Sequence, residues 1–245
     1  TMAVVYVDFN AVTGTLSGTW TFTNGATTVT GTGGAATSEL AAGNYVRAQG
    51  GVQWYKVASV TNDNEFEITP TFQQSTVSDV TVEKNANGGT STTDAFCHLN
   101  QATTDTTRSA GDIIKVRANQ THTYAGVNIT CDEAGDPGSF IMIKGCDSTD
   151  DPWGDGSDVK PVIDFGWTDS YVAINSYWKL ENLVFKRGKG SKGELELYND
   201  SYVLVENCDF QDSYLNHVSV RYRSLLKCIG CTFSNVDYYR AIYLY

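Results

Sequence analysis

The chain has 245 residues, 41% of them hydrophobic, and a formal net charge of −11 at pH 7. This length and composition indicate a protein with a packed core and exclude a disordered chain. Phosphate groups attract cationic surfaces, so an acidic chain is not expected to bind nucleic acid or an anionic membrane. No apolar stretch approaches the roughly 18 residues that a membrane helix needs, so membrane insertion is not expected.

The first part of the chain predicts two kinds of β structure. Residues 1–13 contain one short strand, in Tyr6–Phe9. Residues 14–84 are rich in Thr, Val and Gly, and apolar and polar residues alternate in Thr19–Thr23 and Glu65–Thr69, the period of a strand with one buried face. Asn24-Gly25 lies between two such runs and predicts a hairpin turn. We therefore predict a small antiparallel β-sandwich or barrel over residues 14–84.

A short helix is expected after this module. Thr93 and Asp94 are good helix-capping residues, and apolar residues follow them at helical spacing: Ala95, Phe96, Leu99 and Ala102. Such a helix would cover the open end of a stack of strands.

The last third of the chain contains an internal repeat. Three segments align, Trp178–Phe185, Val203–Phe210 and Leu226–Phe233, and they begin 25 and 23 residues apart. A repeat of this length predicts short strands that stack, turn upon turn, around a continuous core. Phe185, Phe210 and Phe233 are then expected in one interior file. Asn182, Asn207 and Gly230 fall at one point of the repeat, where a tight turn needs a left-handed backbone.

These residues carry a resemblance to a known family. Glu206-Asn-Cys-Asp-Phe210 resembles the short-turn signature of pectate-lyase-like right-handed parallel β-helices, and Tyr6–Phe9, Asn87–Phe96 and Gly111–Val116 resemble their N-terminal cap. The resemblance implies an all-β protein with a parallel β-helix (solenoid) over residues 85–245 and an N-terminal capping helix. The segment 14–84 resembles a small β module that recurs in phage tail and virion proteins.

Six cysteines invite a disulfide or metal interpretation. Cys228-Ile-Gly-Cys231 has zinc or redox spacing, but the second pair of a four-ligand zinc site is missing. The repeat places Cys208, Cys228 and Cys231 inward, where free buried thiols are expected. Cys131 and Cys146 are the one pair to test for a bridge.

One outward sheet face collects candidate functional residues. The repeat brings Glu194, Glu196, His217 and Arg221 into one patch, with Tyr198 beside them. These side chains could run acid–base chemistry on a sugar or hydrogen-bond to one. In the lyases that the fold resembles, an Arg or Lys is the base and acidic residues hold calcium; Arg221 matches in type alone. A solvated polar face is the favoured alternative, because charged side chains are mostly just exposed.

Two further features suggest ligands. Trp153 and Trp167 could offer flat faces to sugar rings, although ordinary loop packing is the favoured interpretation. The loop 147–158 holds five aspartates without the EF-hand order, so a solvated loop is favoured over a calcium site and no cofactor is expected. Lys186–Lys192 is the one basic run and is expected in an exposed loop that could attract an acidic glycan.

Two functions remain. The first is a phage virion component, a tail-spike, fibre or capsid-surface protein. It would lie at the virion surface, outside the cell, assemble with other virion subunits, most simply as a homotrimer, and bind cell-surface polysaccharide. The second is a polysaccharide lyase or glycoside hydrolase acting on an acidic glycan. The module 14–84 and the lack of a convincing catalytic cluster favour the first. Ala241–Tyr245 matches the first strand of a new turn, so further turns or another subunit are expected to cover that end.

Overall fold

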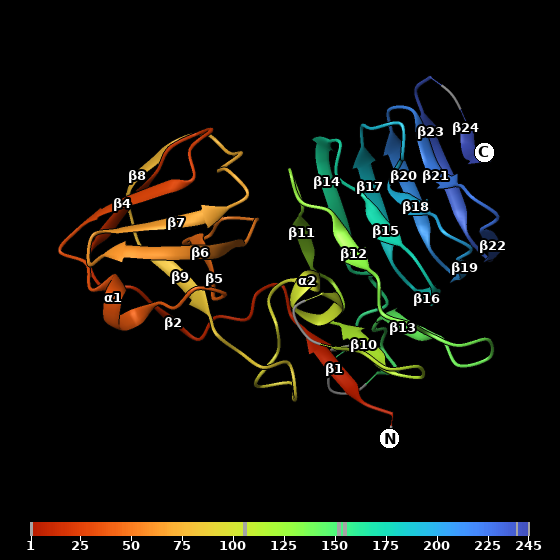
Figure 1. The fold of residues 1–245 in the computed structure, drawn as a ribbon, viewed down its shortest axis with the longest axis horizontal. Helices are drawn as coiled ribbons and strands as arrows, with labels where there is room; N and C mark the ends of the chain where they lie inside the picture. The colour runs from red at the N-terminus through yellow and green to blue at the C-terminus, as the bar shows by residue number, and fades with distance from the viewer. Residues whose placement is uncertain (1, 105–106, 151–152, 154–155, 239, 245) are drawn as a thin grey trace. The chain divides into compact units, whose positions relative to one another are not determined.

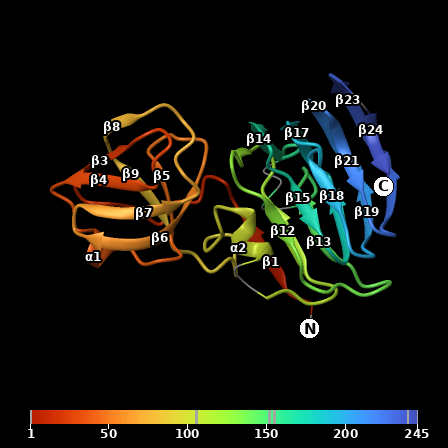
Figure 2. The same ribbon diagram turned by 45° about the horizontal axis from the view of Figure 1, so that its top comes forward.

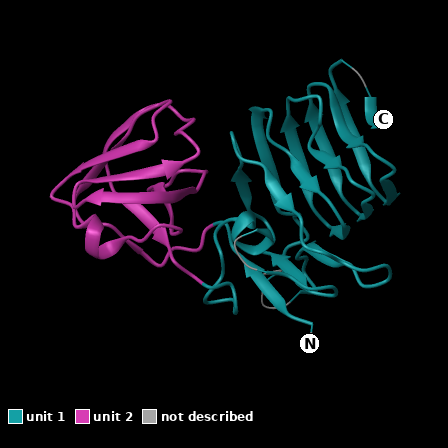
Figure 3. Ribbon diagram, viewed as in Figure 1, with its two compact units in different colours: residues 1–9, 88–245 teal, residues 10–87 magenta. Residues whose placement is uncertain are grey.

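The computed structural model describes residues 2–104, 107–150, 153, 156–238 and 240–244. The chain forms two compact units (Figure 3). Unit 1 comprises Thr1–Phe9 and Gly88–Tyr245, and unit 2 comprises Asn10–Asn87. The predicted module, 14–84, lies within unit 2. Unit 1 is therefore discontinuous in sequence.

Unit 2 is an antiparallel sheet with one short helix, α1 (Ala36–Glu39). Its eight strands lie in the order β2-β9-β5-β6-β7-β4-β3-β8. Their bounds are β2 (Gly14–Thr15), β3 (Thr19–Phe22), β4 (Thr28–Thr32), β5 (Tyr45–Ala48), β6 (Tyr55–Asn62), β7 (Glu65–Thr69), β8 (Val77–Val80) and β9 (Val82–Asn85). The hairpin predicted at Asn24-Gly25 is confirmed, since β3 pairs with β4 and Gly25 has a φ of 76°. Trp20, Phe22 and Phe66 are buried in its core.

Unit 1 consists of three parallel sheets (Figures 1 and 2). Sheet 1 contains β1 (Val4–Val7), β10 (Ile113–Val116), β13 (Ile141–Gly145), β16 (Tyr177–Glu181), β19 (Tyr202–Glu206) and β22 (Leu225–Ile229). Sheet 2 contains β11 (Thr121–Thr123), β14 (Val162–Thr168), β17 (Val184–Gly188), β20 (Asp209–Ser213) and β23 (Thr232–Val236). Sheet 3 contains β12 (Ile129–Cys131), β15 (Val172–Ile174), β18 (Leu195–Leu197), β21 (Asn216–Val220) and β24 (Arg240–Leu244).

From β10 to β24 the chain visits sheets 1, 2 and 3 in the same order each time, so each strand pairs with the strand three places later. The predicted all-β class with parallel strands is therefore present.

The predicted interior file of aromatic rings is confirmed. Phe185 pairs in register with Phe210, and Phe210 with Phe233. The ring centroids are 5.2 Å apart at an interplanar angle of 18° for the first pair, and 5.0 Å apart at 6° for the second. Period-two alternation turns these rings inward, where they join Leu183, Leu195 and Leu197 in one continuous core.

The left-handed turn between sheets 1 and 2 is also confirmed. Asn182, Asn207 and Gly230 have φ angles of 56°, 49° and 63°. The side-chain amide of Asn182 donates to the carbonyl oxygen of Gly145 at 2.9 Å, which ties this corner to the preceding turn.

The capping helix begins later than the sequence predicts. Helix α2 spans Leu99–Thr103, and its N-cap is His98, whose Nδ1 accepts from the Asn100 amide at 3.1 Å. The prediction that Thr93 and Asp94 cap the helix is wrong. The Asp94 carboxylate instead accepts from the Gly88 amide at 3.0 Å and the Thr90 hydroxyl at 2.9 Å, and so closes a loop.

Helix α2 contacts β1 and β12 and buries Leu99 and Ala102 in the core of unit 1, as predicted. Phe96 joins the same core from a position before the helix, where it bridges to Val7. Neither α1 nor α2, the helices of the described residues, is long and apolar enough to span a bilayer.

All six cysteines are free thiols. Cys131 and Cys146 are each buried without a bridge, so the pair singled out for a disulfide is not bonded. Cys208 packs in the core as expected, while Cys228 and Cys231 are partly exposed against it.

Candidate functional site

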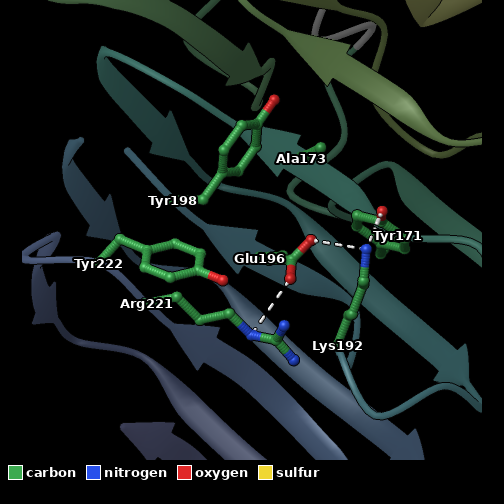
Figure 4. A pocket seen from close by; sticks show the side chains of 7 residues that line it. All are labelled: Tyr171, Ala173, Lys192, Glu196, Tyr198, Arg221 and Tyr222. Atoms are coloured by element: carbon green, nitrogen blue, oxygen red, sulfur yellow. Dashed lines mark hydrogen bonds and ion pairs between the residues drawn. The ribbon is translucent and has the colours of Figure 1, made fainter. Parts of the chain in front are cut away.

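A polar pocket of about 280 Å³ opens on the outward face of sheet 3 (Figure 4). Its register is the one that the repeat predicts, because Ala173 pairs with Glu196, and Glu196 with Ser219. Glu196 comes from β18 and Arg221 directly follows β21, so neighbouring turns bring them together. The lining residues are Tyr171, Ala173, Lys192, Glu196, Tyr198, Arg221 and Tyr222.

The Glu196 carboxylate lies between two cations. Its oxygens are 3.2 Å from Lys192 Nζ and 3.3 Å from Arg221 Nε. Lys192 Nζ also donates to the Tyr171 hydroxyl at 2.6 Å and lies 4.5 Å from the centroid of that ring. The hydrogen bond to Tyr171 raises the pKa of Lys192, and the bond to Glu196 adds to this effect against the opposing effect of burial. Lys192 is therefore an ammonium group at neutral pH.

Tyr198 and Tyr222 form the aromatic side of the pocket. The Tyr198 hydroxyl donates to Asp132 Oδ1 at 2.9 Å, and burial together with this carboxylate raises the pKa of Tyr198 well above its ordinary value. Tyr222 is 66% exposed and has a φ of 51°. Its left-handed backbone belongs to a corner that stacks on the corner before it, where the Asp200 amide donates to the Tyr222 carbonyl oxygen at 3.1 Å.

A second hollow of about 330 Å³ adjoins the first. Asp169, Tyr171, Gly190, Ser191 and Lys192 line it. Tyr171 and Lys192 line both hollows and are hydrogen-bonded to each other. The two hollows therefore meet at this pair.

The structure does not place Glu194 and His217 in this pocket, so the predicted patch of four is wrong in part. Both side chains are 0% exposed and face each other, with His217 Nδ1 2.9 Å from Glu194 Oε2. Glu194 Oε1 also accepts from the Gly188 amide at 3.0 Å, at the start of the loop 188–193, and the His217 ring lies 6.1 and 5.9 Å from the rings of Phe210 and Phe233 in the core. Glu196, Tyr198 and Arg221 remain as predicted members of the site.

The two tryptophans considered as sugar-binding residues, Trp153 and Trp167, do not line the pocket. Trp153 is 3% exposed, and its ring packs 5.5 Å from that of Tyr6, so the favoured interpretation of ordinary packing is confirmed for this residue and the alternative of a sugar-stacking face is wrong. Trp167 is 42% exposed, with a φ of 60°, and lies outside both hollows.

Sequence reasoning did not assign Lys192, Tyr171 or Tyr222 to the site. Lys192 lies four residues before Glu196, in the basic run. Tyr171 lies one repeat before Glu194, at the same position of the repeat. Tyr222 and Arg223 lie one repeat beyond Asn199 and Asp200, two residue types that tolerate a left-handed backbone. That alignment is the signal that could have located the corner.

Metal ligands do not gather in the described part of the chain, where no group of three or more His, Cys, Asp or Glu side chains could hold an ion. In the acidic loop, Asp150 pairs with Lys115 and Lys144. Asp151 and Asp155 lie outside the described residues.

Comparison with family models, with curated proteins and with solved structures found no match to this chain.

Proposed function

We propose that unit 1 is a right-handed parallel β-helix and that the protein is a phage structural protein of the tail-spike, fibre or capsid-surface kind. In this proposal it binds cell-surface polysaccharide through the pocket on sheet 3. The constant order in which the chain visits the three sheets supports the β-helix, as do the stacked Phe185, Phe210 and Phe233.

The pocket has the chemistry that sugars require. Sugar hydroxyl groups bind to charged and planar polar side chains, and the C–H faces of the ring pack on aromatic side chains. Lys192, Glu196 and Arg221 supply the first kind of contact, with Tyr171, Tyr198 and Tyr222 around them (Figure 4). This combination within one recess is the observation that carries the proposal.

The protonation states favour binding over catalysis. A lyase needs a base that is unprotonated near neutral pH, so that it can accept a proton from the sugar. The pKa values of Lys192 and Tyr198 are both raised, which keeps these groups protonated. A glycosidase of the common type needs two carboxyl groups across the scissile bond, whereas Glu196 is the one carboxylate among the lining residues of the 280 Å³ pocket. An enzyme acting on an acidic glycan remains the second candidate, supported by the two cations beside Glu196.

The proposal is tested by measuring the affinity of the full chain for a panel of neutral and acidic bacterial surface polysaccharides. For a glycan that binds, Lys192→Met and Arg221→Gln are each expected to weaken binding about tenfold, since each removes a charged hydrogen bond. Arg223→Gln is the matched control, because Arg223 is an 85%-exposed cation outside the pocket. No binding across the panel, or equal loss in the control, contradicts the proposal. New reducing ends or unsaturated uronates would establish the enzyme instead.

The assembly is tested separately. A virion spike is expected to be an oligomer, with a trimer favoured, and light scattering at micromolar concentration measures the mass directly. A monomer would contradict this part of the proposal.

A further inference from the structure

The buried pair Glu194–His217 lies at the base of the loop 188–193 that carries Lys192, because Glu194 directly follows this loop and bonds to its first residue, Gly188. Both side chains are 0% exposed, and both take part in hydrogen bonds to the backbone as well as to each other. His217 Nδ1 is 2.9 Å from Glu194 Oε2, and His217 Nε2 is 3.0 Å from the Ser234 carbonyl oxygen. Glu194 Oε1 accepts from the Gly188 amide at 3.0 Å. The pair therefore joins three consecutive turns of the chain.

These contacts determine how many protons the pair holds. A carbonyl oxygen can only accept, so His217 Nε2 must carry a proton to bond with Ser234. The remaining contact, between Nδ1 and the carboxylate, then needs one more proton, on either the nitrogen or the oxygen. Without that proton, a nitrogen lone pair faces a carboxylate, and an uncompensated negative charge is buried.

Aromatic side chains of the core lie beside the pair. The rings of Phe210 and Phe233 flank the imidazole, with centroids 6.1 and 5.9 Å away. The titratable group that acts most strongly on Glu194 is His217 itself, and the other contact to its carboxylate comes from a backbone amide of β17. Burial raises the pKa of Glu194, against the lowering effect of the bonds from His217 and Gly188.

The loop 188–193 is anchored on β21, the strand that carries His217. The Ser191 carbonyl oxygen accepts from Asn216 Nδ2 at 2.9 Å and from Ser219 Oγ at 3.0 Å. The Glu194 amide donates to the His217 carbonyl oxygen at 2.9 Å. Gly193 has a φ of 73°, and a Cβ at this position would lie 2.5 Å from the Asn216 carbonyl oxygen, so the loop crosses β21 in close contact. Lys192 reaches the pocket from the middle of this anchored segment.

We propose that Glu194 and His217 form a one-proton switch that positions the loop 188–193, and with it Lys192, so that ligand binding in the pocket depends on pH. The part that concerns ligand binding rests on the proposed function; the part that concerns the loop does not. A raised Glu194 pKa means that the pair stabilises the fold while it holds its proton and loses this contribution as the pH rises. The loop is therefore expected to be more ordered at low pH and to loosen as the pH rises through the raised pKa of Glu194.

The decisive variant is Glu194→Gln. A glutamine amide can donate to Nδ1 while its oxygen still accepts from Gly188, so every hydrogen bond is retained without a shared proton. Asp200→Asn is the matched control, because it makes the same carboxylate-to-amide change in the exposed pair with Arg223. His217→Phe leaves Glu194 buried without its partner and is expected to loosen the loop at every pH.

Hydrogen exchange of the segment 186–194 measures the loop directly, as protection factors corrected for the intrinsic effect of pH. In the unmodified chain and in Asp200→Asn, protection is expected to fall about tenfold or more as the pH rises from about 5, just above the ordinary glutamate pKa, to about 9, whereas in Glu194→Gln it stays constant. Nitrogen NMR of the unmodified chain provides a second readout that needs no variant. At about pH 6, His217 Nε2 should carry a proton.

Each outcome is decisive. Protection that does not change with pH in the unmodified chain, or a titration that persists in Glu194→Gln, overturns the proposal, as does an unprotonated Nε2. If the loop titrates but no polysaccharide binds, the switch stands and the proposed function fails. If a polysaccharide binds, but its affinity does not change over the pH range in which the loop loosens, only the coupling between the loop and the pocket is refuted.

Discussion

The side-chain amide of Asn207 donates to the amide oxygen of Asn182 at 3.0 Å, from one turn of the chain to the next. Both residues have the left-handed backbone of the corner between sheets 1 and 2. Gly230 occupies the same point one turn later and supplies the backbone conformation without the side chain. The corner thus separates two contributions to stability, backbone strain and the amide ladder, which substitutions can measure independently.

Asn207→Ala is expected to cost about 2 kcal/mol of the free energy of unfolding, because it loses the amide bond and replaces a residue that tolerates the left-handed region with one that does not. Asn207→Gly is expected to cost about 1 kcal/mol, because it loses the amide bond while glycine adopts the left-handed backbone without steric strain. Urea unfolding monitored by circular dichroism measures both. An alanine variant as stable as the glycine variant would show that strain plays no part at this corner.

Phe210→Ala is expected to cost about 3–5 kcal/mol, since it removes the middle ring of the interior file and leaves a cavity between Phe185 and Phe233. Phe140→Ala is the control, because Phe140 packs on Tyr177 and Tyr202 but is partly exposed. The same urea experiment compares them. Similar losses for the two variants would argue against the interior file as a main source of stability.

The buried thiols are expected to resist alkylation in the native protein. Burial raises the pKa of Cys131 and Cys208 far above that of an exposed thiol, and raises the pKa of Cys146 to about 12. Because the thiolate is the reactive form, these residues should react with iodoacetamide at about pH 8 at least 100-fold more slowly than in denaturant. Peptide mass spectrometry should find modification first at the partly exposed Cys228 and Cys231.

The same reagent tests whether the thiols are free. In denaturant without a reducing agent, all six cysteines should take up the label. A protein that resists labelling at Cys131 and Cys146 until it is reduced would contain the disulfide that the structure lacks.

Asp150 is expected to contribute to stability at neutral pH and to lose this contribution in acid. Burial acts to raise its pKa, but hydrogen bonds from Lys144 and Lys115 outweigh this effect and lower it. A carboxyl group with a lowered pKa stabilises the fold above its unfolded pKa and loses that effect as the pH falls through its folded pKa. Asp150→Asn should therefore cost about 1–3 kcal/mol at about pH 7 and progressively less below about pH 4.

Urea unfolding across this pH range measures the effect of Asp150. Asp200→Asn is the control, since that carboxylate belongs to a pair whose side chains are 57% and 85% exposed, and such pairs contribute little. If the cost of Asp150→Asn did not change with pH, the stabilising effect of the Asp150 side chain would not come from its negative charge.

Much of the fold could be predicted because the strand period repeats along the chain. The repeats Trp178–Phe185, Val203–Phe210 and Leu226–Phe233 predict stacked strands, and the spacing of Phe185, Phe210 and Phe233 predicts the register. The start of α2 could not be predicted in this way. Histidine is an uncommon N-cap, and Asp94 closes a loop with Gly88 and Thr90 instead.

The site was predictable only where strands determine it. Glu196, Tyr198 and Arg221 gather because they lie on or beside paired strands. Glu194 belongs to the same face by its strand period, yet its carboxylate is buried against His217 and the Gly188 amide, at the base of the loop 188–193. The shape of that loop depends on Gly193 and on bonds to β21, which no strand period encodes.

The insertion of unit 2 between β1 and the rest of unit 1 has a consequence for folding. In unit 1, the Tyr6 amide donates to Gly89 and the Phe96 amide to Tyr6, so the chain leaves and re-enters at neighbouring points. In unit 2, the Thr13 amide donates to Lys84 next to the β2–β9 pair, so its two ends also meet. The entropy of closing a loop depends on the length of flexible chain. Once unit 2 has folded, the flexible chain between β1 and β10 shortens to residues 8–9 and 88–112, so the entropic cost of docking β1 on β10 is smaller than the distance between them in the sequence suggests.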